Sequence, residues 1–273
     1  MRRILFVLGA VLFIFVGCVS ENTSSEAEEK IVMICNKEYS VNTQSVTIVK
    51  KQLLQEDFDN LKMLKRLDSL VIVNSGLEDI SFISEIKTLR TLSLSANKIS
   101  DISALSSLTL LSYVDLSDNE ISDISPLEKL EKLSELYLTG NKISDITPIK
   151  AMQKLERISI AKNDVADISA LAFCKNLKYL DLTMNSVLDI SPLSDLSMLE
   201  ELYLGQNLIT GVYDLERLEK LRILKLDGNS IVEIKPVYKL VNLKVLYLDT
   251  SSVNQNQREA LEQALPECNI QYM

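Results

Sequence analysis

Six aspartates recur every 22 residues, and they form the arrangement in this sequence that most suggests a metal site. They are Asp79, Asp101, Asp123, Asp145, Asp167 and Asp189. If the units stack like neighbouring strands, adjacent carboxylates lie about 5 Å apart, a separation compatible with bridging calcium. The alternative is that each Asp caps the turn around the Ser two residues later, which needs no ion. We favour capping and expect no metal and no cofactor.

The side chains that usually carry catalysis are absent or ordinary. The chain contains no His, the commonest general base and metal ligand. It contains no Cys-x-x-Cys pair, catalytic Ser-His-Asp set or phosphate-binding loop. Cys174 falls in a column of Leu and Met, where a thiol behaves as a small hydrophobe. The net charge of −9 repels phosphate backbones. We therefore expect neither an enzyme nor a nucleic-acid-binding protein.

A motif containing leucine and asparagine repeats every 22 residues along most of the chain. Residues 92–99 read L-S-L-S-A-N-K-I, and the motif returns at 136–143 and 202–209. Its asparagine stands at Asn97, Asn119, Asn141, Asn163, Asn185, Asn207 and Asn229, with Ser75 and Ser251 one period outward. A unit this short cannot bury its seven apolar positions alone, so the units must stack on their neighbours.

Each part of the unit predicts an element. The alternation in L-x-L predicts a short strand with both leucines on one face. The Asn follows at the turn, where its amide can pair with backbone groups, so the asparagines should form a buried hydrogen-bonded ladder. The D-I-S-P-L segment turns the chain onto the opposite side, and its Pro fixes φ. Too few residues remain for a long helix, which predicts 3-10 turns or short helices there.

The pattern L-x-L-x-x-N-x-I-x-D-I-S-P-L resembles the 22-residue leucine-rich repeats of bacterial internalins, and residues 116–127 carry it from its second leucine onward. The resemblance extends from Val46 to Val253. It implies an α/β solenoid, a horseshoe with a parallel β-sheet on the concave side, 3-10 or short helical turns on the convex side, and a cap at each end. It also implies a non-catalytic protein-binding role, with a partner on another cell as one alternative.

The N-terminus has the features of an export signal. Two arginines precede an apolar run from Ile4 to Val16, which as a helix is too short for a hydrocarbon core of about 30 Å. Residues 15–18 resemble a bacterial lipobox, which implies that Cys18 is lipidated and becomes the first mature residue. The alternatives are a plain secretory signal, an uncleaved membrane anchor and twin-arginine export. Residues 19–30 are polar and acidic, as expected of a tether.

We therefore divide the chain into five segments: a signal peptide (1–17), a lipidated Cys with an acidic tether (18–30), an N-terminal cap (31–66), leucine-rich repeats (67–253) and a C-terminal cap (254–273). Strands are predicted at 31–35 and 46–49, with helical character over 52–66. At the other end we predict an amphipathic helix over 256–264, with Leu261 and Leu265 facing inward, and a final strand at 269–272. Cys35 and Cys268 lie in opposite caps, too distant to pair.

The polar positions of the strands supply a candidate binding face. Two columns of these positions hold five of the nine tyrosines, and Tyr is enriched at protein interfaces. We predict that a protein partner contacts Tyr113, Asp115, Tyr137, Tyr179, Asp181, Tyr203, Lys225 and Tyr247. The alternative is that Tyr is simply a favourable strand residue. Tyr113-x-Asp115 and Glu135-x-Tyr137 return 66 residues later, through duplication or by chance, so two similar patches should lie along the groove.

These features lead to one main hypothesis and three alternatives. The main hypothesis is an exported, monomeric bacterial lipoprotein, held on the outer face of a membrane by Cys18, that binds an unidentified protein through its concave face. The alternatives are a regulatory or scaffold subunit that docks on an envelope enzyme, a host-cell adhesin of internalin type, and an enzyme with a site outside the concave face.

Overall fold

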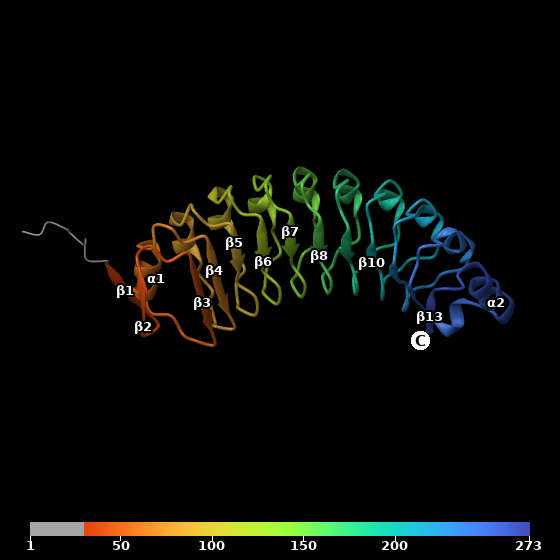
Figure 1. Cartoon of the computed structure of the whole chain (residues 1–273), viewed down its shortest axis with the longest axis horizontal. Helices are drawn as coiled ribbons and strands as arrows, with labels where there is room; N and C mark the ends of the chain where they lie inside the picture. Colours follow the sequence, from red (N-terminus) through yellow and green to blue (C-terminus); the bar gives the residue numbers. More distant parts are fainter. Residues whose placement is uncertain (1–29) are drawn as a thin grey trace, which may run out of the picture.

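One short strand per repeat unit stacks into a single parallel sheet that follows the whole arc of the molecule (Figure 1). The computed structural model describes residues 30–273, so the predicted signal peptide, Cys18 and the predicted tether up to residue 29 lie outside the described residues. The strands pair in sequence order: β3 (Ser45–Val49), β4 (Ser69–Val73), β5 (Thr91–Ser93), β6 (Tyr113–Asp115), β7 (Glu135–Tyr137), β8 (Arg157–Ser159), β9 (Tyr179–Asp181), β10 (Glu201–Tyr203), β11 (Ile223–Lys225), β12 (Val245–Leu248) and β13 (Asn269–Tyr272).

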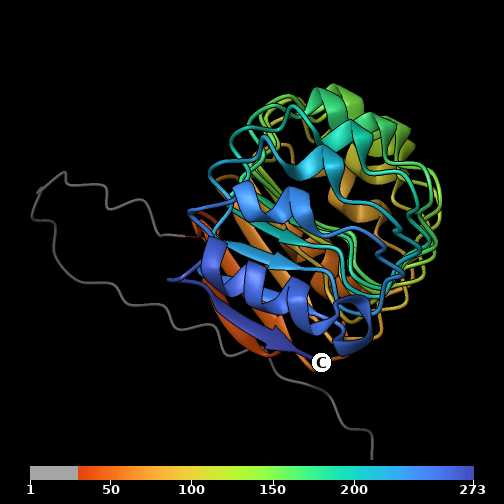
Figure 2. The same ribbon diagram turned by 90° about the vertical axis from the view of Figure 1, so that its right-hand side faces the viewer.

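The side of the solenoid opposite the sheet consists of 3-10 turns, as the D-I-S-P-L segments predicted. They are η1 (Ser81–Glu85), η2 (Ser103–Ser107), η3 (Ser125–Leu127), η4 (Thr147–Ala151), η5 (Ser169–Phe173), η6 (Ser191–Leu193), η7 (Tyr213–Leu215) and η8 (Lys235–Lys239). A further 3-10 turn, η9 (Thr250–Ser252), follows β12 where the preceding units have their asparagine turn. Figure 2, which looks along the solenoid, shows strands and turns on opposite sides of the stacked coils. The predicted fold class is thus confirmed.

The apolar columns of the repeat form one continuous core. The leucine column is almost completely buried from Leu67 to Leu243, and so is the isoleucine column from Ile80 to Ile234. Cys174 is also fully buried, at the position that Leu or Met occupies in the neighbouring units. Each unit therefore buries its apolar side chains against the next unit, as the 22-residue period required.

The N-terminal end is covered by a hairpin and a helix. The hairpin pairs β1 (Ile31–Ile34) with β2 (Lys37–Ser40), and helix α1 (Gln55–Lys62) packs against β1. The Asp57 carboxylate joins them, because it accepts hydrogen bonds from the backbone N–H groups of Cys35 (2.6 Å) and Leu54 (2.8 Å). The first predicted strand ends one residue early, since Cys35 has a positive φ of 48°. β3 lies in the segment predicted as cap but already pairs with β4.

The C-terminal end is covered by helix α2 (Gln255–Ala264) and strand β13, both close to their predicted positions. Leu261 and Leu265 are buried, which confirms the predicted inward face of the helix. The helix begins with a capping box in which the Asn254 carboxamide oxygen accepts from the backbone N–H of Gln257. Figure 1 shows β1 and α2 at opposite ends of the arc, so Cys35 and Cys268 cannot pair, and both are free thiols.

The asparagine column forms the predicted ladder. The Asn97 carboxamide accepts from the backbone N–H of Leu77 (3.1 Å) and donates to the carbonyls of Ile72 and Leu94 (both 2.8 Å). Equivalent bonds recur at all six later asparagines. Each side chain thus ties its own turn to the preceding unit, which fixes the register of the stack. Beyond the last Asn, the Asp249 carboxylate accepts from the backbone N–H of Gly228 (2.7 Å).

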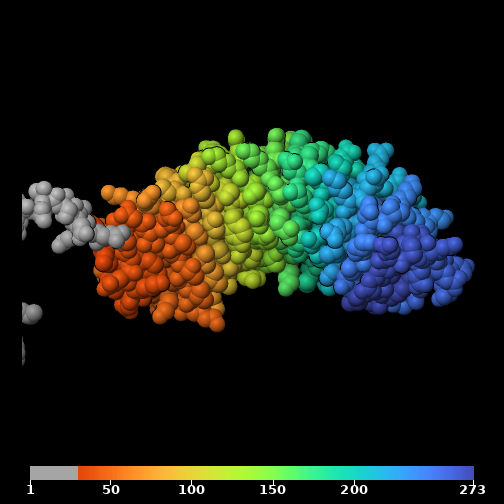
Figure 3. Space-filling view, in the orientation of Figure 1, coloured from red at the N-terminus to blue at the C-terminus, as the bar shows by residue number. Residues whose placement is uncertain are grey.

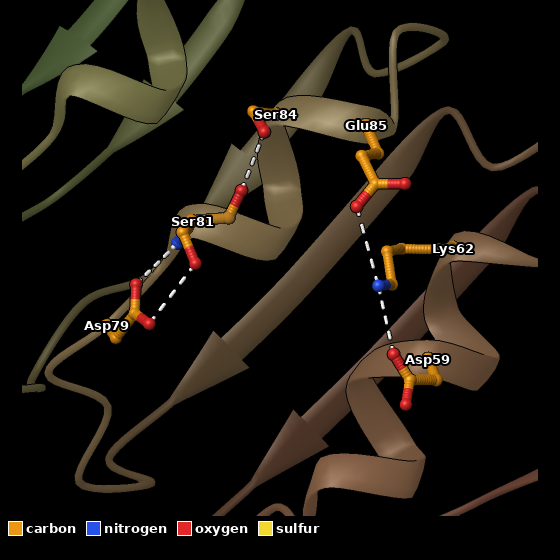
Figure 4. Close-up of polar contacts among 6 residues, drawn as sticks. All are labelled: Asp59, Lys62, Asp79, Ser81, Ser84 and Glu85. Carbon is orange, nitrogen blue, oxygen red and sulfur yellow. Dashed lines mark hydrogen bonds and ion pairs between the residues drawn. The ribbon is translucent and has the colours of Figure 1, made fainter.

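The aspartate column caps the turns, as we favoured. Asp79 Oδ1 accepts from the backbone N–H of Ser81 (2.7 Å), and Asp79 Oδ2 accepts from the Ser81 hydroxyl (3.1 Å; Figure 4). The backbone bond recurs at the other five aspartates of the column, with Thr147 in the place of Ser in one unit. Figure 4 also shows Lys62 between Asp59 and Glu85, which links α1 to η1.

Candidate binding surface

The eight residues predicted as a contact face all lie on strands β6 to β12 of the concave sheet, and all are half-buried. Figure 3 shows the arc as a filled surface, hollowed along its lower edge between the two ends. A hollow of about 370 Å³ opens over the C-terminal half of the sheet and is lined in part by Asp181, Tyr203, Lys225 and Tyr247. Two other strand positions that we expected to face outward, Ser93 and Ser159, are buried. The Ser93 hydroxyl donates to the Asp115 carboxylate, and the Ser159 hydroxyl bonds to that of Thr139.

Two tyrosine pairs with the same geometry lie three strands apart. The ring centroids of Tyr113 and Tyr137 are 5.6 Å apart at an interplanar angle of 44°, and those of Tyr179 and Tyr203 are 5.4 Å apart at 44°. In both pairs the second tyrosine donates its hydroxyl to a glutamate two residues earlier, at 2.9 Å. The structure therefore contains the two similar patches expected from the 66-residue repetition.

Cations connect the tyrosine pairs into one continuous row. The Arg157 guanidinium lies over the Tyr179 ring at 4.3 Å, and Lys225 Nζ lies over the rings of Tyr203 (5.3 Å) and Tyr247 (4.5 Å). Arg157 also interacts electrostatically with the Tyr137 hydroxyl on its other side. We call this row the aromatic–cation ladder; its members are Tyr113, Tyr137, Arg157, Tyr179, Tyr203, Lys225 and Tyr247.

The sequence-based prediction of the contact face omitted three charged residues of this surface: Glu135, Arg157 and Glu201. All three lie in the earlier of the two polar columns, so their positions were available from the sequence. Their contacts could not be predicted from the sequence, because a column position does not reveal which neighbouring side chain a long side chain will reach. Asp115 and Asp181 were included, and each accepts from a backbone N–H two residues later, at 3.0 and 2.9 Å.

Four tyrosines of this surface, Tyr113, Tyr137, Tyr179 and Tyr203, have a pKa raised mainly by burial. Burial, reinforced by the nearby Asp181 carboxylate, raises the pKa of Tyr179 from 10.0 to about 12. Burial and the hydrogen bond to Glu201 raise the pKa of Tyr203 further. Burial also raises the pKa of Tyr137, while the neighbouring Arg157 guanidinium opposes the rise. The hydroxyls of Tyr137 and Tyr203 are held by Glu135 and Glu201, so these two side chains have little rotamer freedom left to lose on binding.

Residues 30–273 contain neither a cluster of metal ligands nor a helix able to cross a membrane. In this part of the chain no group of three His, Cys, Asp or Glu side chains converges closely enough to hold a metal ion. The aspartates of the capping column already use their oxygens on the adjoining turns. Over the same residues, no helix combines the length and the apolar character needed to cross a membrane.

Two family models of leucine-rich repeats match the repeat region of this chain. A model described as "Leucine Rich repeats (2 copies)" matches residues 87–127, 109–151 and 153–195, and one described as "Leucine rich repeat" matches 175–231. Together these matches cover more than half of the 273 residues. Leucine-rich-repeat folds are typically non-catalytic scaffolds for protein interaction. No curated sequence matches the chain.

Several solved structures share the fold. An internalin (InlF) of Listeria monocytogenes is 26% identical with a TM-score of 0.69, over 87% of this chain and 76% of the internalin. Internalin C2 of the same organism is 25% identical with a TM-score of 0.62, over 78% and 85% of the two chains. The ectodomain of the Arabidopsis thaliana receptor kinase GASSHO1/SCHENGEN3, solved with CASPARIAN STRIP INTEGRITY FACTOR 2, is 21% identical with a TM-score of 0.67, over 86% of this chain and 30% of the ectodomain. The 22-residue units, their asparagine ladder and these matches make this chain a member of the leucine-rich-repeat proteins, with the internalins among its structural relatives.

Proposed function

We propose that this protein is a non-catalytic binding module that holds a partner protein on its concave face. The aromatic–cation ladder is the observation that carries the proposal. It places five half-buried tyrosines and two cations in one row on β6 to β12, with every ring in contact with a neighbour. Ordered aromatic side chains with polar tips supply most of the energy at typical protein interfaces.

The size of the surface supports the same proposal. Seven strands at about 4.8 Å spacing give the ladder a length of roughly 30 Å, enough for an interface of ordinary size. The surface lies on a sheet rather than on loops, so the partner meets it in nearly its bound conformation. The module acts as a monomer in this proposal, because the concave face must remain free for the partner.

Affinity capture from envelope extracts tests the proposal, with the full chain as bait. We expect one or more proteins to be retained by the wild-type chain and lost from the triple variant Tyr137→Ala, Tyr179→Ala and Tyr203→Ala. The matched control is Tyr213→Ala, since Tyr213 is 62% exposed on the convex turn η7. Unchanged retention by a folded triple variant contradicts the proposal.

We further propose that the protein is exported and anchored by lipid on Cys18, on the outer face of a membrane of the cell envelope. Support comes from the sequence of residues 1–18, with its two arginines, short apolar run and Gly17-Cys18 junction. Each buried CH₂ of an acyl chain contributes about 0.8 kcal/mol to membrane binding. Metabolic labelling with a fatty-acid analogue should mark the wild-type chain and leave Cys18→Ala unlabelled. Labelling of that variant at the wild-type level would remove the anchor from the proposal.

A further inference from the structure

Charges of alternating sign follow one another along the aromatic–cation ladder. The carboxylates of Asp115 and Glu135 flank the first tyrosine pair on β6 and β7, and Arg157 follows on β8. The carboxylates of Asp181 and Glu201 flank the second pair on β9 and β10, and Lys225 follows on β11. We count each carboxylate pair as one charged position, located midway between its two strands, and each cation as another. Each charged position then lies one and a half strands from the next. At about 4.8 Å per strand, the sign changes every 7 Å or so.

These charges are not neutralised by ion pairs within the molecule. Nine ion pairs join residues elsewhere in the described part of the chain, and none involves the six charged residues named above. The four carboxylates accept bonds from hydroxyl or backbone N–H groups, but a carboxylate offers about four acceptor positions, so each keeps capacity for a ligand. The two cations rest on ring faces, and both residues are only half-buried.

The spacing of the charges distinguishes between ligand shapes. An extended peptide presents every second side chain on one face, about 6.7 Å apart, so four such side chains span roughly 20 Å. The four charged positions of the ladder span roughly 22 Å. A helix laid along the groove presents side chains of one face once per turn, about 5.4 Å apart, and four of them span only some 16 Å. The extended chain therefore keeps its side chains in register with the ladder, and the helix does not.

We propose that the ladder binds an extended segment of the partner whose alternate side chains read basic, acidic, basic, acidic from β6 to β11. This inference rests on the proposed protein-binding role of the concave face and specifies the chemistry of the partner. Lys or Arg side chains meet the carboxylate pairs, and Asp or Glu side chains meet Arg157 and Lys225. The intervening tyrosine rings contact the aliphatic stems of the basic side chains.

Fluorescence anisotropy with labelled synthetic peptides and the full chain tests this inference. The matching peptide contains K-S-E-S-K-S-E, and the control peptide K-S-K-S-E-S-E has the same composition in blocks. The control peptide makes at most two favourable charge contacts in any register, against four for the matching peptide. We expect the matching peptide to bind roughly fivefold to thirtyfold more tightly at low salt, as two additional half-exposed ion pairs provide. Raising the ionic strength should remove most of this difference.

Charge reversal on the protein should change the preference in a defined way. In Arg157→Glu the second ladder position becomes acidic, so K-S-K-S-K-S-E should bind more tightly than K-S-E-S-K-S-E. In Lys225→Glu the fourth position becomes acidic, and K-S-E-S-K-S-K should become the preferred peptide. Lys154→Glu reverses an exposed charge in the same unit as Arg157, outside the ladder, and should leave the original preference intact. Circular dichroism verifies that each variant is folded.

The inference is overturned if the matching and block peptides bind within twofold of each other, or if neither ladder variant changes its peptide preference. Absence of binding by the matching peptide at millimolar concentration also overturns it. The proposed function is tested separately from this inference, by the loss of partner capture in the triple tyrosine variant. Peptide indifference combined with that loss would reject the charge pattern and retain the concave binding face.

Discussion

The asparagine ladder allows a quantitative prediction for Asn163, a buried residue in the middle of the stack. Its carboxamide oxygen accepts from the backbone N–H of Ile143 (2.9 Å), and its amide donates to the carbonyls of Leu138 (2.9 Å), Ile160 (3.0 Å) and Ala161 (3.1 Å). Replacement by Ala leaves the Ile143 N–H buried without a partner, at a cost of about 1–3 kcal/mol.

Loss of the Asn163 amide costs less free energy at the three carbonyls, because each carbonyl still accepts a hydrogen bond from another donor. The carbonyl of Leu138 still accepts from Asn141, that of Ile160 from Asn185, and that of Ala161 from the Gly140 N–H. Each lost bond then costs only about 0.5 kcal/mol, the lower end of the net range. We expect Asn163→Ala to lower the free energy of unfolding by about 3 kcal/mol in total.

Urea unfolding followed by far-ultraviolet circular dichroism measures this loss, with the slope of the transition as the test of two-state behaviour. Asn176→Ala is the matched control, because Asn176 is exposed and donates one hydrogen bond to the Gln153 carbonyl; it should cost no more than about 0.5 kcal/mol. Asn163→Asp keeps the acceptor for Ile143 but directs a negative oxygen at the carbonyls, so it should be at least as destabilising as Ala. A loss below about 1 kcal/mol in Asn163→Ala would refute the role of the ladder in stability.

Three further predictions concern the turns, the tyrosines and the aspartate column. Gly140 has a φ of +68°, and an added Cβ would lie 2.5 Å from Asp118 Oδ1, so Gly140→Ala should lower the free energy of unfolding in urea by about 1–2 kcal/mol. Ala96 occupies the equivalent position with a φ of 55°, so Ala96→Gly should stabilise the protein. The pKa of Tyr179 is raised from 10.0 to about 12, mainly by burial and then by Asp181, so the folded chain keeps a proton that the unfolded chain loses. Stability should therefore be complete below pH 10 and fall as pH rises towards 12, and this fall should be shallower in Tyr179→Phe; an equal slope in both proteins would contradict the assignment. Because each column aspartate already binds its own turn, a chelator should leave the melting temperature unchanged, and a calcium-dependent shift would revive the metal interpretation.

Features that repeat with the unit could be predicted from the sequence. The apolar columns, the asparagine ladder and the capping aspartates each involve one residue type and a local or next-unit contact, so the 22-residue period is enough to define their partners. The caps were harder to predict, because each cap sequence occurs only once and no repeat period defines its contacts. Strand β2 was not predicted, since Lys37–Ser40 has no alternation of apolar and polar residues, and it exists because it pairs with β1.

The binding surface, too, could be predicted from the sequence only in part. The sequence by itself determined that five tyrosines stand on one face of the sheet and that two similar patches are separated by three units, because strand geometry fixes which side of the sheet each residue faces. Only the tertiary structure decided that Arg157 and Lys225 bridge the tyrosines into one ladder. These contacts join residues 22 positions apart, through long side chains whose rotamers are set by packing across neighbouring strands, and no periodicity in the sequence encodes a rotamer.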